Sequence, residues 1–158
     1  MRKRSNRRVR NVAMPTLVFM HTIPDAEIAT FTALDAFREG YASPGQFDIL
    51  LDTRDLLLLA ASAQKDEGVI AVCSAANIAL GQIRDSWDGE RFAPLTTDEL
   101  NALAVLVDIS NDWWRRKSGT LYQAAFTALK EWRVKQGEML NEDRRQENRT
   151  DETGLVCS

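Results

Sequence analysis

A stripe of apolar and small side chains between Val69 and Trp87 constrains the fold of this chain more than any other feature. Its members recur at alternating steps of four and three residues: Val69, Cys73, Ala76, Leu80, Ile83 and Trp87. This spacing keeps one face of an α-helix turned towards a partner helix. Further small residues, mostly alanines, lie beside the stripe and let neighbouring backbones approach closely. We therefore expect the central helix of an antiparallel bundle here.

Two helices before this stretch and one after it carry start and stop signals. The first is expected to begin after Pro24 and to end at Gly40. Ser43-Pro44 is typical of an N-cap followed by the first residue of a second helix. Thr96 and Glu99 have the spacing of a capping box, in which two side chains satisfy the first free N–H groups of a helix.

The stretch 97–136 carries two apolar patterns separated by Gly119. The second pattern comprises Leu121, Tyr122, Ala125, Phe126, Leu129 and Trp132. A helix tolerates one glycine at a cost of about 1 kcal/mol relative to alanine, so the stretch forms one long bent helix or two. We favour one. The sequence shows no alternation typical of strands, and it predicts an all-α antiparallel bundle of four to five helices joined by short loops.

Charge divides the chain into three parts: a flexible basic arm (1–11), a helical bundle domain (12–136) and a disordered polar tail (137–158). Residues 1–10 carry six bases and no acid, whereas the 158-residue chain has a net charge of −3. The bundle and the tail are therefore acidic. The apolar stretch 12–20 is expected to be buried, as an extended segment or a short helix. Met1 and Met14 are both possible starts, and only the first includes the arm.

The two cysteines do not suggest a disulfide framework, because Cys73 belongs to the apolar stripe and Cys157 to the polar tail. A reducing, cytoplasmic location is expected. Pro15 interrupts the apolar run after the basic arm, which argues against a signal peptide. No apolar run approaches the roughly 20 residues that cross a bilayer, so no membrane association is expected.

Candidate catalytic and metal-binding residues are few. Asp48, Asp52 and Asp55 would share a helix face, where carboxylates can hold a divalent cation or transfer protons. A solvated acidic face is the simpler interpretation, as it is for Asp108 and Asp112. The chain has a single histidine and no glycine-rich phosphate loop. We therefore expect no enzyme activity, no metal and no cofactor.

Two basic stretches are the candidate binding sites. The first is Trp113-Trp114-Arg115-Arg116-Lys117, where adjacent helical positions point about 100° apart. One indole is expected in the core and the other partly exposed, next to three bases, as a partner-binding patch. The alternative is two buried indoles and solvated bases. The second stretch is the arm, whose bases could contact phosphates or fold onto the acidic body: Arg2, Lys3, Arg4, Arg7, Arg8 and Arg10.

The opening Met1-Arg-Lys-Arg-Ser-Asn-Arg-Arg8 resembles the start of a group of small helical proteins from proteobacterial phages, prophages and plasmids. The likeness extends to Ala33-Leu-Asp-Ala-Phe-Arg-Glu-Gly40 and to the order of helices through Trp132-Arg133. The segment 13–21 and the acidic tail depart from the group's pattern. The resemblance implies an origin in a mobile element. Members of the group have no assigned chemistry, so no catalytic residue carries over.

These observations lead to two functional hypotheses. The first is a non-enzymatic accessory protein of a phage or mobile element that binds a host protein, such as a defence or regulatory component, and inhibits it. The alternative is a nucleic-acid-binding protein that uses the basic arm together with Arg115–Lys117. Oligomeric state is open.

Overall fold

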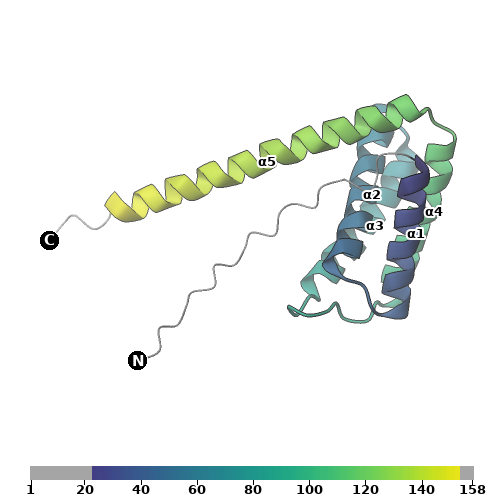
Figure 1. Cartoon of the computed structure of the whole chain (residues 1–158), viewed down its shortest axis with the longest axis horizontal. Coiled ribbons are helices and arrows are strands. Elements are labelled where there is room, and N and C mark those ends of the chain that lie inside the picture. Colours follow the sequence, from purple (N-terminus) through teal and green to yellow (C-terminus); the bar gives the residue numbers. More distant parts are fainter. Residues whose placement is uncertain (1–22, 154–158) are drawn as a thin grey trace.

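The computed structural model describes the backbone of residues 23–153 and the side chains of residues 23–144. This part of the chain is all-α, as predicted, with no strand among the described residues (Figure 1). Its helices are α1 (Ile23–Glu39), α2 (Pro44–Ala63), α3 (Glu67–Asp85), α4 (Thr97–Arg115) and α5 (Gly119–Thr153). The predicted arm (1–11), the apolar stretch 12–20 and residues 154–158 lie outside the described residues.

Helices α1 to α4 form an antiparallel four-helix bundle (Figure 1). Each packs on its neighbour in the chain, and α1 also packs on α4, so the four helices close a ring around a shared core. Helix α5 crosses one end of the bundle against α2 and then projects away from it. None of the helices in the described range is long and apolar enough to span a membrane.

The predicted helix starts are present. The Thr96 hydroxyl accepts a hydrogen bond from the Glu99 backbone N–H at 3.2 Å, and the Glu99 carboxylate accepts from the Thr96 backbone N–H at 2.8 Å. Ser43 precedes α2, and its backbone N–H donates to the Gln46 side chain at 2.8 Å. Gly40 ends α1 with a φ of 82°, a left-handed conformation that favours glycine.

The stripe on α3 lies in the core, as predicted. Val69, Cys73, Ala76, Leu80 and Ile83 are all buried, and Trp87 at its end is half-buried against Phe92. The core has two clusters along the bundle axis. The first contains Cys73 and lies at the end crossed by α5, and the second contains Leu80 and Ile83.

The stretch 97–136 is two helices, so the single bent helix favoured from the sequence is wrong. Helix α4 ends at Arg115, and the Ser118 hydroxyl caps α5 by accepting a hydrogen bond from the Leu121 backbone N–H at 3.2 Å. The break has a packing reason. It lets α5 turn across the bundle end, where Tyr122 meets Trp114 with ring centroids 4.9 Å apart.

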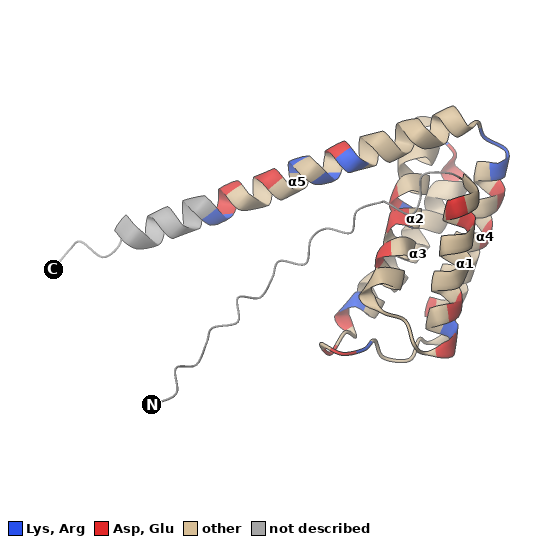
Figure 2. Cartoon of the chain, in the orientation of Figure 1, with Lys and Arg blue, Asp and Glu red and all other residues tan. Residues whose placement is uncertain are grey.

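Helix α5 continues past Gly137 and ends at Thr153. The polar composition after Gly137 had predicted a disordered tail from that residue. Strong helix formers such as Glu138, Met139 and Leu140 follow that glycine, and no proline interrupts them. Figure 2 shows acidic and basic residues interspersed along the projecting part. Glu131 and Lys135 stand four residues apart, a spacing that adds a few tenths of a kcal/mol to a helix.

Candidate functional site

The patch Trp113–Lys117 differs from its prediction, because both indoles are buried. Trp113 is 7% exposed and Trp114 is 4% exposed. The expectation of one outward-facing indole is therefore wrong, and the alternative of two buried indoles is confirmed. The physical reason is that two different elements cover the end of α4. Helix α3 begins against one side of it and α5 begins against the other, so side chains pointing about 100° apart are both enclosed.

Each indole has a defined structural partner. The Nε1–H of Trp113 donates to Oδ2 of Asp66 at 3.0 Å, while Oδ1 of the same aspartate accepts from the Val69 backbone N–H at 3.2 Å. Asp66 therefore caps α3 and satisfies the buried indole at once. The rings of Trp113 and Trp114 meet edge to face at 4.8 Å, and Trp114 meets Tyr122 in the same way. The two indoles join α3, α4 and α5.

The three bases of the patch lie at the surface and contact the protein's own side chains. Arg115 pairs with Glu27 of α1, and Arg116 pairs with Asp112 one turn earlier. Lys117 places its Nζ 4.7 Å from the centroid of the Trp113 ring. Exposed pairs of this kind contribute little to stability. Without an outward indole, the patch offers a partner charge but no aromatic anchor. The alternative site, Arg2, Lys3, Arg4, Arg7, Arg8 and Arg10, lies outside the described residues.

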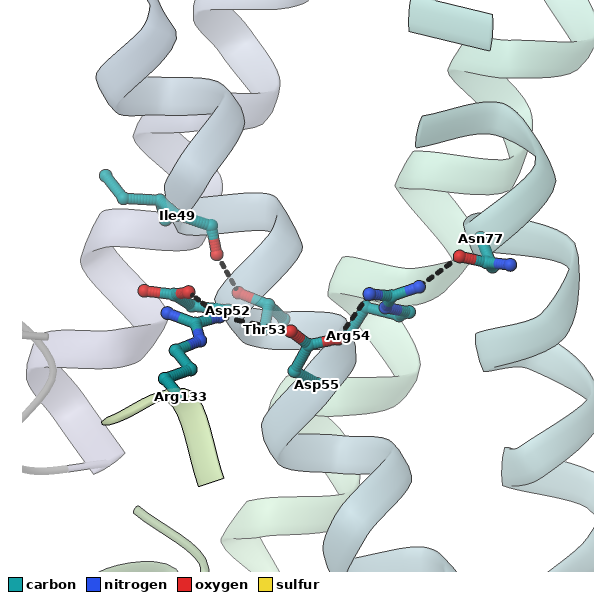
Figure 3. A network of polar contacts seen from close by, with 7 residues as sticks. All are labelled: Ile49, Asp52, Thr53, Arg54, Asp55, Asn77 and Arg133. Atoms are coloured by element: carbon teal, nitrogen blue, oxygen red, sulfur yellow. Dashed lines mark hydrogen bonds and ion pairs between the residues drawn. The ribbon is translucent and has the colours of Figure 1, made fainter. Parts of the chain in front are cut away.

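The acidic face of α2 is not a solvated face, because Asp52 is buried. Arg133 of α5 pairs with Asp52 and donates to Asp55 at 3.1 Å (Figure 3). Arg54 in turn pairs with Asp55 and donates to Asn77 of α3. The network joins α2, α3 and α5. The described residues contain no group of His, Cys, Asp or Glu side chains placed to hold a metal ion.

Burial dominates the electrostatics of this network. It raises the pKa of Asp52 to about 6, although the hydrogen bond and the charge of Arg133 pull that pKa down. Burial also raises the pKa of Asp48, again against the charge of Arg133. Asp108 and Asp112, by contrast, are exposed, as expected. The buried carboxylates are engaged in holding α5 against α2, which is a structural role.

Trp132, which the sequence pattern placed among the core residues, is exposed and lines a groove between α2 and α5. Trp132 is 54% exposed and stands beside Leu59. Their groove has a volume of about 250 Å³, and its lining includes the half-buried Leu58 and the buried Leu129. Trp132 and Arg133 are neighbours, so they point in different directions, and Arg133 faces the Asp52 carboxylate. The sequence alone did not show which of the two neighbours would face the bundle.

The apolar face of α5 also continues beyond the bundle. Leu140 follows Leu129 by three helical turns, and Met139 follows Trp132 by two. Met139 and Leu140 are each 59% exposed. The face that packs against α2 thus runs out along the projecting helix without a cover among the described residues (Figure 1).

A second hollow, of about 420 Å³, lies at the opposite end of the bundle beside the α3–α4 loop. Its carboxylate, Asp88, accepts the backbone N–H groups of Glu90 and Arg91 at 2.8 and 2.9 Å. These hydrogen bonds lower the pKa of Asp88. The carboxylate therefore shapes the loop.

Comparison of the chain with protein-family models, with curated proteins and with solved structures finds no match. Any functional proposal must therefore rest on the chain's own sequence and on the arrangement of its side chains.

Proposed function

We propose that this protein acts without catalysis, by docking the projecting part of α5 into an apolar groove of a partner protein. The observation that carries the proposal is the uncovered apolar face formed by Met139 and Leu140 on a helix that leaves the bundle. Amphipathic helices are commonly bound in this way, with their apolar face in the groove of the partner. Methionine suits such a surface because its unbranched side chain adapts to irregular contacts.

The partner class follows from the resemblance of Met1–Arg8 and of the helix order to small proteins of mobile elements. We propose a protein of the host cell, a defence or regulatory component that α5 would occupy and inhibit. The acidic and basic residues that are interspersed along the projecting part of α5 (Figure 2) suit a protein surface of mixed charge better than a uniformly negative one. This favours a protein over nucleic acid as the ligand of α5.

The test uses the opposite side of the same helix as its control. Val134 is 55% exposed and lies well over 90° around α5 from both Met139 and Leu140. A host protein captured by the full chain is purified, and its affinity is measured for the M139A/L140A variant and for V134A. We expect the double variant to lose at least about tenfold in affinity, which is about 1.4 kcal/mol, and V134A to retain it. Equal affinity of all three proteins would overturn the proposal.

The alternative, nucleic-acid binding through Arg2, Lys3, Arg4, Arg7, Arg8 and Arg10, makes a different prediction. Deleting residues 1–10 would then abolish a binding that weakens steeply with salt, whereas M139A/L140A would leave it unchanged. Measuring both ligands with the same three variants and the deletion separates the two functions.

A further inference from the structure

We infer that the apolar stretch 12–20 of this same chain occupies the groove formed by Leu58, Leu59, Leu129 and Trp132. The inference is independent of the partner proposed for Met139 and Leu140. Three observations select this occupant: the position at which the described chain begins, the composition of the stretch, and the size of the groove.

The described chain begins at the end of the bundle that holds the groove, because Ile23, Leu58 and Leu129 all belong to or pack against the same core cluster. Ile23, the first residue of α1, lines a small cavity together with Leu56 of α2 and Tyr122 of α5. Leu59 follows Leu56 by one turn, and Leu129 follows Tyr122 by two, so the groove lies roughly 5 to 10 Å farther along these two helices than the cavity. Residues 12–22, fully extended, span up to about 35–40 Å. The stretch therefore reaches the groove with length to spare.

The composition of the stretch matches the groove. Residues 12–20 read Val-Ala-Met-Pro-Thr-Leu-Val-Phe-Met and contain no charged side chain. They stand between a strongly basic arm and a helical bundle, where six large apolar side chains would otherwise remain in water. Each large apolar side chain that becomes fully buried gains about 1.5–3 kcal/mol. Four of the six residues that line the groove are large and apolar, namely Leu58, Leu59, Leu129 and Trp132, and the other two are Asp55 and Ser62.

The size of the groove favours side chains of a peptide segment. Its volume of about 250 Å³ is below the range of roughly 300–1,000 Å³ typical of small-molecule sites. Pro15 favours an extended conformation at Met14, because the residue before a proline avoids the helical region. In an extended segment, successive side chains point to opposite sides, so every second apolar side chain of the stretch could enter the groove.

The experiment places a photocrosslinker in the groove of the full-length protein. A Trp132→p-benzoylphenylalanine variant is irradiated at low concentration, and the crosslinked peptides are identified by mass spectrometry. The matched control carries the same group in place of Ile78, an exposed apolar side chain on α3. We expect crosslinks from position 132 to residues 12–20 of the same chain, several-fold more abundant than any such crosslink from position 78.

A second set of variants checks that the contact is specific. L17D and F19D should each lower the yield of the crosslink several-fold, whereas N6D, in the basic arm, should leave it unchanged. A crosslinked dimer from position 132 would assign the groove to a second copy of the chain and overturn the inference. So would a 12–20 crosslink that is equally frequent from both positions, or none from position 132. All of these readouts use the purified protein alone, so loss of partner binding by M139A/L140A does not affect them.

Discussion

Arg133 of α5 donates a hydrogen bond to the Asp55 carboxylate of α2 across 3.1 Å, between residues 78 positions apart in the chain. The same guanidinium pairs with the buried Asp52. These contacts hold α5 against the bundle just before it projects. A buried ion pair costs desolvation when it forms, but breaking it leaves an unpaired charge, which costs more.

Removing Arg133 should therefore destabilise the protein more than removing both charges. We expect R133A to lower the free energy of unfolding at pH 7 by about 3–5 kcal/mol, because Asp52 remains buried without its cation. The double variant D52N/R133A should lose less than the sum of the two single variants, and the difference is the coupling energy. Urea denaturation of the wild type, R133A, D52N and D52N/R133A measures this coupling energy. Additive losses would show that the two side chains do not interact.

The stability of the protein should depend on pH through Asp52. The pKa of this carboxyl is about 6 in the folded protein, against about 3.9 for an unfolded aspartate. The folded state therefore binds the proton more tightly. The contribution of Asp52 to the free energy of unfolding is complete below about pH 4 and is lost as the pH rises through about 6.

The D52N variant lacks this titration. Between pH 7 and pH 4.5, the stability of the wild type should increase relative to that of D52N by on the order of 1–3 kcal/mol. Urea denaturation at the two pH values gives both differences, and D108N, at an exposed aspartate, serves as the control. A change of the opposite sign would mean that Arg133 outweighs burial and holds the pKa of Asp52 below its usual value.

Asp66 should contribute through both of its oxygens. D66A removes the cap of α3 and the acceptor of the Trp113 indole, and we expect a loss of about 2–3 kcal/mol in the free energy of unfolding. W113F removes the indole hydrogen bond but keeps an aromatic ring, and should cost about 1–2 kcal/mol. In the D66A background, W113F should cost much less than in the wild type. Thermal denaturation of the four proteins tests this, and equal costs in both backgrounds would contradict a shared hydrogen bond.

Cys73 should react slowly with thiol reagents. Its side chain is buried, and burial raises the pKa of the thiol from 9.0 to about 11, which alone lowers the thiolate fraction at pH 8 about 100-fold. A C157S variant leaves Cys73 as the single thiol. The rate at which this thiol is modified should be far lower in the native protein than in the same protein unfolded in urea. Comparable rates in both conditions would mean that Cys73 is not in a closed core.

The parts of the fold that the sequence predicted correctly depend on neighbours along the chain. The Val69–Ile83 stripe could be predicted because helical periodicity alone brings its members to one face. The Thr96 cap is legible because its two partners stand three residues apart. Ser118 is also a local signal, because serine is a common N-cap and Leu121 stands three residues after it. Together with Gly119, it would have predicted the break between α4 and α5.

The candidate site was predicted less well because it depends on contacts between distant residues. No pattern of neighbouring residues predicts that Asp66 accepts a hydrogen bond from the Trp113 indole, or that α5 covers Trp114. The burial of Asp52 likewise requires Arg133, which lies on another helix. The adjacency of Trp132 and Arg133 was informative. It only became so once the ion pair fixed which of the two faces the bundle.

The turn at Ser118 and the ion pairs of Arg133 attach α5 to the bundle near one end of the helix, and the rest of α5 extends beyond these contacts. About 20 residues follow Arg133, so the far end of the helix lies roughly 30 Å beyond that support. At that length, a tilt of about 10° moves the tip by about 5 Å, nearly one helical pitch. Even a small change in the angle at which the Arg133 contacts hold α5 would therefore produce a displacement large enough to alter what the tip can reach.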